Sequence, residues 1–182
     1  QLSDRYEAGV ILEQSIAPQV ETTSSETVDV VFSLGSCYWT HQFAQRFGLV
    51  SCRSGAAMSG LFCGNKNCGL WQLHCCPYSA GPDPEAELTE SDWISPTGQF
   101  KARKGAVLDS LECRESGCPE MRTRYLKSPN LERKGKCSTR QGKPWVAEVC
   151  DEGNYVSAFS CRSGKNCSDW EVTCCPAESV PP

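Results

Sequence analysis

Residues 67–77 read NCGLWQLHCCP and residues 166–176 read NCSDWEVTCCP, so one segment rich in cysteine and tryptophan occurs twice in the chain. Moving outward from these segments, the other cysteines recur at a nearly constant offset, and Cys52-x2-Gly55 returns as Cys150-x2-Gly153. Such self-similarity indicates tandem copies of one structural unit. The first copy contains Cys37, Cys52, Cys63, Cys68, Cys75 and Cys76, and the second contains Cys137, Cys150, Cys161, Cys167, Cys174 and Cys175.

The cysteine content indicates an oxidised, extracellular protein. The chain has 182 residues and 14 cysteines, an even number and far above ordinary intracellular usage. The competing interpretation, a reduced metal-binding protein, is disfavoured because His41 and His74 both lie in the first copy, whereas a duplicated metal site repeats its ligands. We therefore expect seven disulfides in a secreted protein that needs no metal or other cofactor.

The adjacent cysteine pairs restrict the disulfide pattern. Neighbouring residues on a strand point to opposite faces, so two adjacent cysteines reach different partners. In the first copy we expect one of Cys75 and Cys76 to bond to Cys52 and the other to Cys37, and the second copy to repeat this arrangement.

The remaining cysteines are expected to close short loops. Cys63 and Cys68 are separated by only four residues, and so are Cys113 and Cys118. Because Cys113 and Cys118 have no counterparts in the first copy, pairing them with each other leaves the shared frame intact. Connectivity is not deducible from sequence alone, so this scheme is an argument from symmetry.

Short alternating runs separated by glycines predict strands. Residues 145–150 and 155–161 place apolar side chains two apart, which is the period of a half-buried strand. Helical patterns are scarce, and residues 40–47 and 116–127 are the segments in which a short helix competes with a strand. We predict a mainly β, disulfide-rich fold of two tandem homologous small domains with little helix.

Composition sets the predicted boundaries. The segment that follows Pro77 is rich in proline, glycine and acidic residues, which favours an extended, solvated connection, and the end of the chain has similar composition. We therefore predict a first cysteine-rich repeat domain at residues 1–78, a linker at 79–98, a second repeat domain at 99–176 and a flexible tail at 177–182.

Charge is distributed unevenly along the chain. Residues 1–98 contain four Lys/Arg and eleven Asp/Glu, whereas residues 99–182 contain fourteen and eleven, so the two halves carry −7 and +3. The basic residues form either a solvated loop or a site for an anionic extracellular partner, since summed charge steers association. Opposite charges on the two halves also suit head-to-tail contacts between copies. The candidate anion-binding residues are Lys101, Arg103, Lys104, Arg122, Arg124, Lys127, Arg133, Lys134, Lys136, Arg140 and Lys143.

Several other functions are disfavoured by the sequence. Neither histidine lies in a recognisable nucleophile motif, so we do not expect an enzyme. No aromatic platform interleaves the basic residues, which argues against nucleic acid. No run approaches the ~18–20 apolar residues that cross a bilayer, so membrane insertion is not expected. Asn166-Cys167-Ser168 fits the N-glycosylation sequon, which makes Asn166 a candidate glycosylation site.

The tryptophans fall into two groups. Trp71 and Trp170 are duplicated and are expected to pack in the core against the disulfides. Trp39 and Trp93 are not duplicated and are candidates for exposed anchors, because tryptophan is enriched at binding surfaces.

The half-motif formed by Cys150-x2-Gly153, Val156, Phe159, Trp170 and the Cys174-Cys175 pair resembles the repeat of dermatopontin-like extracellular matrix proteins. The chain departs from that family's pattern, because the Asp-Arg pair before the tryptophan is absent. Three residues before each tryptophan, where the family has Asp, this chain has Cys68 and Cys167. The resemblance implies a secreted, mainly β protein that acts in matrix assembly, adhesion or carbohydrate binding.

The sequence thus favours a secreted, non-enzymatic structural or adhesion protein that self-assembles into extracellular matrix or fibres through its acidic and basic halves. The partners this implies are a second copy of the chain, another extracellular protein or an anionic glycan. Two alternatives remain open. One is a secreted effector (a toxin, immune modulator or inhibitor) that binds a host protein, and the other is a carbohydrate-binding lectin.

Overall fold

The computed structural model describes residues 11–14, 30–32, 36–40, 48–79, 83–95, 98–115, 118–133, 135–162 and 167–179. These residues form strands and turns without a helix, so the prediction of a mainly β, disulfide-rich fold is confirmed. No helix long and apolar enough to cross a membrane occurs in these ranges. Near the N-terminus, β1 (Ile11–Gln14) and β2 (Val30–Phe32) pair as a separate two-stranded sheet.

The first repeated segment forms an antiparallel hairpin. β5 (Ala56–Cys63) pairs with β6 (Trp71–Pro77), and β6 alternates buried and half-buried residues as a strand with one face in the core should. A disulfide between Cys63 and Cys68 closes the turn of the hairpin. The backbone N–H of Gly69 donates to the Asn65 side-chain oxygen at 2.8 Å inside that turn.

The hairpin occurs three times, not twice. The C-terminal copy is β16 (Asn154–Cys161) with β17 (Trp170–Ser179). Between the two, β9 (Ala106–Leu108) and β10 (Ser110–Cys113) pair with β12 (Arg124–Lys127) and β11 (Met121–Arg122), respectively. The Cys113–Cys118 disulfide closes this middle hairpin as Cys63–Cys68 closes the first. The expectation that Cys113 and Cys118 lack counterparts is therefore wrong, and a helix at 116–127 is replaced by strands.

Each hairpin is entered through the same turn. Gly55, Gly105 and Gly153 have φ values of 83°, 80° and 72°, in the left-handed region that glycine adopts without strain. Each glycine is followed by an N–H that donates to the carbonyl three residues back, as in Ala56 to Arg53 at 3.0 Å. These equivalent turns, roughly 50 residues apart, define three structural copies.

The copies are joined by a cyclic exchange of strands. β4 (Gly48–Ser51) of the first copy pairs with β10 of the middle copy, and β8 (Gln99–Lys101) of the middle copy pairs with β16 of the third. β15 (Ala147–Val149) of the third copy pairs with β5 of the first, which closes the cycle. The residue that follows each exchanged strand donates its backbone N–H to a backbone carbonyl of the same neighbouring copy. These bonds run from Cys52 to Asp109 (3.1 Å), from Ala102 to Ser157 (2.8 Å) and from Cys150 to Ser59 (2.7 Å).

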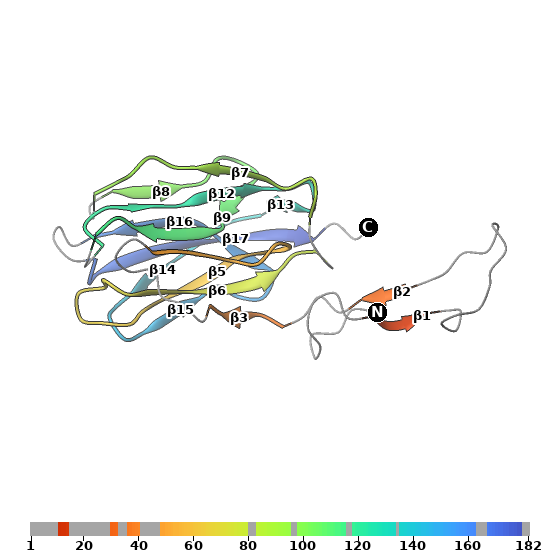
Figure 1. Ribbon diagram of the computed structural model, residues 1–182, viewed down its shortest axis with the longest axis horizontal. Coiled ribbons are helices and arrows are strands. Elements are labelled where there is room, and N and C mark those ends of the chain that lie inside the picture. Colours follow the sequence, from red (N-terminus) through yellow and green to blue (C-terminus); the bar gives the residue numbers. More distant parts are fainter. Residues whose placement is uncertain are drawn as a thin grey trace.

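One outer strand completes each sheet. β3 (Tyr38–Trp39) pairs with β6, β7 (Glu87–Glu90) with β12, and β14 (Ser138–Gly142) with β17, whose far end also pairs with β13 (Leu131–Arg133). We call β15-β5-β6-β3 sheet 1 and β8-β16-β17-β14 sheet 3. Sheet 2 consists of β4, β10 and β11, continued by β9, β12 and β7 beyond Asp109 and Thr123. Figure 1 shows these strands lying side by side in one body.

The larger of two buried clusters lies between the three sheets. The equivalent positions Trp71, Met121 and Trp170 are each at most 1% exposed and belong to one cluster of packed side chains. The rings of Trp71 and Trp170 meet edge to face at a centroid distance of 5.4 Å, and Trp71 also contacts Phe159 at 5.2 Å. The prediction that both tryptophans are core residues is confirmed, and burial of such large rings supplies much of the apolar driving force.

All fourteen cysteines form disulfides, and the predicted pattern is confirmed. The choice that the sequence left open is resolved, because the first cysteine of each adjacent pair bonds to the cysteine after the exchanged strand. The second cysteine of each adjacent pair bonds to the cysteine immediately before the outer strand. The bonds are Cys37–Cys76, Cys52–Cys75, Cys63–Cys68, Cys113–Cys118, Cys137–Cys175, Cys150–Cys174 and Cys161–Cys167.

The predicted domain boundaries do not divide this structure. Strands of residues 1–78 pair with strands of residues 99–176, and both ranges contribute to the same core. The predicted linker, 79–98, contains β7 and the buried Asp83, which accepts hydrogen bonds from Ser128 and from the Glu85 N–H. The predicted tail begins inside β17, which continues to Ser179 and buries Ala177.

Gly142 tests the packing of the core. A Cβ at this position would overlap the indole ring of Trp170, so there is no room for a larger residue. We expect Gly142→Ala to lower the free energy of unfolding by about 1–3 kcal/mol, as overpacked cores do. The control is Gln141→Ala on the exposed neighbouring position, which we expect to change stability by less than about 0.5 kcal/mol. Guanidinium unfolding with the disulfides intact measures both, and equal stabilities of the two variants would contradict this packing.

Candidate functional site

Disulfides close two of the three corners at which the sheets meet. Cys52–Cys75 ties the end of β4 in sheet 2 to β6 in sheet 1, and Cys150–Cys174 ties the end of β15 in sheet 1 to β17 in sheet 3. At the third corner, between sheets 2 and 3, the equivalent positions are Ala102 and Tyr125. The register confirms this equivalence, because Tyr125 pairs with Leu108 as Cys75 pairs with Met58.

The corner without a disulfide contains a cleft of about 680 Å³, which we call the corner cleft. One wall comes from β7, β12 and the residues that follow β7, and the other comes from β8 and the turn after it. This volume lies in the range of small-molecule sites, roughly 300–1,000 Å³. The lining residues are Glu87, Thr89, Glu90, Ser91, Asp92, Ile94, Gln99, Phe100, Lys101, Arg103, Lys104, Ala106, Tyr125 and Lys127.

The base of the cleft is apolar and firmly held. Phe100 is 1% exposed and stacks on Phe159 of the core at a centroid distance of 6.2 Å. Tyr125 is half-buried against the same cluster. Burial raises the pKa of Tyr125, so its hydroxyl stays protonated at neutral pH. The half-buried ring of Tyr125 therefore offers an apolar surface beneath the polar walls, whereas the ring of Phe100 is buried.

Acidic residues of the first half neutralise several of the predicted anion-binding residues. Glu90 pairs with Arg122 at 2.9 Å and with Arg124 at 3.4 Å, and Glu87 lies 3.5 Å from Lys127. The opposite charges of the two halves therefore meet inside one molecule across β7 and β12. Glu87 and Glu90 are therefore engaged within the molecule, and head-to-tail assembly stays a prediction.

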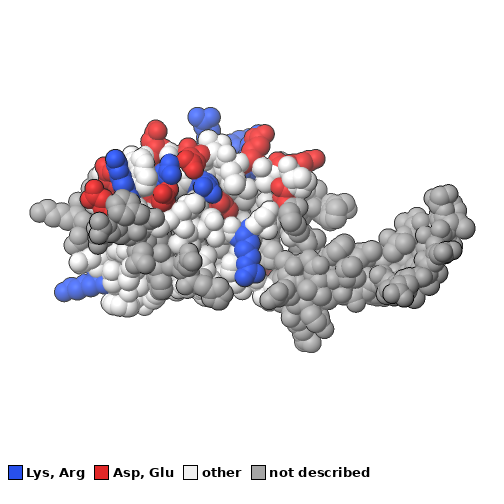
Figure 2. Space-filling view, viewed as in Figure 1, with Lys and Arg blue, Asp and Glu red and all other residues white. Residues whose placement is uncertain are grey.

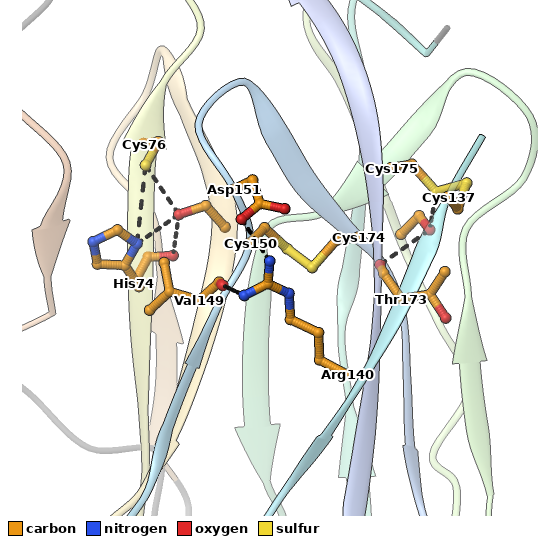
Figure 3. Close-up of a disulfide and its surroundings, with 12 residues drawn as sticks. His74, Cys76, Cys137, Arg140, Val149, Cys150, Asp151, Thr173, Cys174 and Cys175 are labelled. Atoms are coloured by element: carbon orange, nitrogen blue, oxygen red, sulfur yellow. Dashed lines mark hydrogen bonds and ion pairs between the residues drawn. A yellow bond between two sulfur atoms is a disulfide. The ribbon is translucent and has the colours of Figure 1, made fainter. Parts of the chain in front are cut away.

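Arg140 has a structural role. Its guanidinium donates to the Val149 carbonyl at 2.6 Å and lies 2.6 Å from a carboxylate oxygen of Asp151. Figure 3 shows this side chain reaching from β14 to the end of β15, beside the Cys150–Cys174 disulfide. The residue holds the exchanged strand in place, and an anionic ligand would have to compete with Asp151.

Three cations of the predicted set remain available on the corner cleft. Lys101, Arg103 and Lys104 are exposed, and no ion pair involves them in the part of the chain that the structure describes. We call them the cationic turn. Figure 2 shows basic and acidic side chains intermixed over β7, β8 and β12, whereas the surface over β5 and β6 is largely uncharged.

The other predicted residues do not join this site. Lys136 and Lys143 are exposed but do not line the cleft. The side chain of Arg133, together with Lys134 and Asn166, lies outside the described residues, so their predicted roles stay predictions. Sequence analysis missed Tyr125, Thr89 and Asp92 as site residues. The shared four-residue spacing inside the Cys63 and Cys113 loops was the pattern that pointed to a middle copy.

The two candidate surface tryptophans are not exposed anchors. Trp93 is half-buried, with the guanidinium of Arg122 4.9 Å from its ring centroid and that of Arg114 at 5.7 Å. Trp39 is half-buried beside His74, at a centroid distance of 4.9 Å. The tryptophan with the most exposed side chain in the described residues is Trp145, which is 63% exposed and has φ of 66°.

His74 lies in a structural contact. Its Nδ1 is 2.7 Å from the Ser59 hydroxyl, which also donates to Cys76 Sγ at 3.0 Å. Figure 3 shows His74 beside Cys76. Ser59 is 1% exposed, so its hydroxyl is not placed to attack a substrate, and burial lowers the pKa of His74. Cys37 and Cys76 lie near His74 but share a disulfide, so neither offers the thiolate that binds a metal. His41 lies outside the described residues.

Comparison with known proteins adds no identity. No family model matches the chain. No curated protein matches it significantly. The resemblance to dermatopontin-like proteins therefore stays a prediction.

Asp109 provides a test of how the middle copy differs from the others. It occupies the bulge position of Ser59 and Ser157, is 6% exposed, and burial raises the pKa of its carboxyl from 3.8 to about 7, against a smaller opposing effect of Arg124. Between pH 3.8 and about pH 7, the Asp109 carboxyl stays protonated in the folded protein but is ionised in the unfolded chain. Stability therefore falls as pH rises through this window, at up to about 1.4 kcal/mol per pH unit.

We expect Asp109→Ser, which restores the residue of the other two copies, to flatten this pH dependence between pH 4 and 7. Urea unfolding at one-unit pH intervals measures the slope. Ser157→Ala, at the equivalent bulge position of the third copy, serves as the control and should leave the slope unchanged, because it removes no ionisable group. An identical slope in wild type and Asp109→Ser would show that the carboxyl titrates normally.

Proposed function

We propose that this protein is a secreted, non-enzymatic adhesion or matrix protein that binds an anionic extracellular partner through the cationic turn, Lys101, Arg103 and Lys104. Seven disulfides in a chain of 182 residues support an oxidising, extracellular environment. The observation that carries the proposal is that other basic residues are engaged by Glu87, Glu90 and Asp151, while the cationic turn is not.

An anionic partner is supported over a second copy of the chain. Head-to-tail assembly through β7 would have to displace the ion pairs that Glu87 and Glu90 already form with β11 and β12. Adjacent cations on one exposed turn attract extended polyanions, and this attraction weakens as salt screens it. Exposed cations also lose little hydration before contact, so they act mainly on association.

Retention on immobilised heparin, used as a polyanion probe, tests this proposal. We expect Lys101→Gln/Arg103→Gln/Lys104→Gln to elute at clearly lower salt, consistent with about tenfold weaker binding from three lost surface charges. The charge-matched control, Arg53→Gln/Arg114→Gln/Arg162→Gln, removes three exposed cations outside the cleft lining and should elute near wild type. Equal shifts for the two variants would mean that only net charge matters, and the cationic turn would not be the binding site.

A further inference from the structure

We propose that the corner cleft is a saccharide-binding site that takes a short segment of an acidic glycan. This inference rests on the proposed function and makes it specific, since it names the partner as a sugar with acidic groups and places part of it between sheets 2 and 3.

The first argument is the break in symmetry. The three copies share the cyclic exchange, the bulge and the entry turn, and two corners carry an inter-sheet disulfide at equivalent positions. Only the middle copy has Ala102 and Tyr125 in place of these cysteines, although its loop disulfide, Cys113–Cys118, is retained. The corner cleft lies where this crosslink is missing.

The second argument is the chemistry of the two walls. The wall formed by β8 and its turn carries the cationic turn, which would hold a sulfate or carboxylate group. The opposite wall carries the exposed side chains of Thr89 and Asp92, and Asp92 forms no ion pair in the part of the chain that is described. A carboxylate and a hydroxyl at such positions accept and donate hydrogen bonds to sugar hydroxyl groups.

This combination disfavours a simple inorganic anion. A bare sulfate or phosphate would be attracted by the cationic turn but repelled by Asp92, and it would leave the half-buried ring of Tyr125 unused. A sugar presents hydroxyl groups, an apolar ring face and an acidic substituent together, which matches the hydroxyl-binding wall, the aromatic base and the cationic wall. The volume of about 680 Å³ also exceeds what one small ion fills.

The missing disulfide offers a direct test. The variant Ala102→Cys/Tyr125→Cys places at the third corner the disulfide that the other two corners have. The substitution removes the ring of Tyr125, and the new bond joins the two walls of the corner cleft. The matched control is Leu88→Cys/Leu126→Cys, because Leu88 and Leu126 pair directly and stand where Cys37–Cys76 and Cys137–Cys175 stand in the other copies. Both variants add one disulfide to the middle copy, and neither Leu88 nor Leu126 lines the corner cleft.

Binding of a fluorescent heparin-derived tetrasaccharide, followed by anisotropy, is the readout. We expect the Ala102→Cys/Tyr125→Cys variant, with its eighth disulfide verified by mass, to bind at least about tenfold more weakly, while the Leu88→Cys/Leu126→Cys control binds within about twofold of wild type. Both should still be retained by long immobilised heparin, because the cationic turn is intact. Unchanged tetrasaccharide binding in the crosslinked variant would overturn the saccharide site without touching the proposed function.

Asp92→Ala keeps the inference falsifiable if the new disulfide does not form. Loss of a negative charge strengthens purely electrostatic binding of an anion, whereas loss of a hydroxyl acceptor weakens saccharide binding. We expect Asp92→Ala to bind the tetrasaccharide about tenfold more weakly than wild type. We also expect that inorganic sulfate, added at the same concentration of negative charge as the tetrasaccharide, does not displace the tetrasaccharide from the wild-type protein. Stronger tetrasaccharide binding by Asp92→Ala, or full displacement of the tetrasaccharide by sulfate, would rule out the corner cleft as a saccharide site. The proposed function would still stand if only the Lys101→Gln/Arg103→Gln/Lys104→Gln variant lost retention on heparin.

Discussion

The structure depends on the cyclic exchange of strands between its three copies. Each copy gives the strand before its hairpin to a neighbour's sheet, and the N–H that follows donates to a carbonyl at the neighbour's bulge, as Cys150 does to Ser59 at 2.7 Å. A copy on its own would leave one strand unpaired and its tryptophan or methionine exposed, which costs both hydrogen bonds and apolar burial. Three copies therefore form one core, and the disulfides reinforce a topology that strand pairing has already set.

Departures from threefold symmetry locate the features that need a functional explanation. The first and third copies share both inter-strand disulfides and a bulge serine whose hydroxyl contacts a cysteine sulfur. In the middle copy Leu126 replaces that cysteine, and the bulge residue is Asp109. The pair at the corner becomes Ala102 and Tyr125, and the corner cleft lies beside them. Pseudosymmetry thus separates residues that maintain the fold from residues that are free to vary.

The charge pattern shows why linear sequence is a poor guide to a surface. Glu87 and Glu90 belong to a segment that reads as a solvated linker, yet they form an outer strand paired with β12. There Glu90 pairs with Arg122 and Arg124, and Glu87 pairs with Lys127, although these basic residues look available when the chain is read in order. The cationic turn differs from these residues in its place in the fold, because it lies across the corner cleft from β7 and forms no ion pair in the part of the chain that the structure describes.

The sequence by itself predicted the strand-rich class and a symmetric set of disulfides, because side chains alternate along a strand and adjacent cysteines diverge. Which cysteine of each adjacent pair bonds to which partner was decided by the tertiary structure. The sequence did not reveal the middle copy, in which Met121 replaces tryptophan and only Gly105, Cys113 and Cys118 keep the common frame. Only the tertiary structure decided which strands are exchanged and where a cleft opens. Those outcomes depend on contacts between residues roughly 50 positions apart or more, and no local periodicity encodes such contacts.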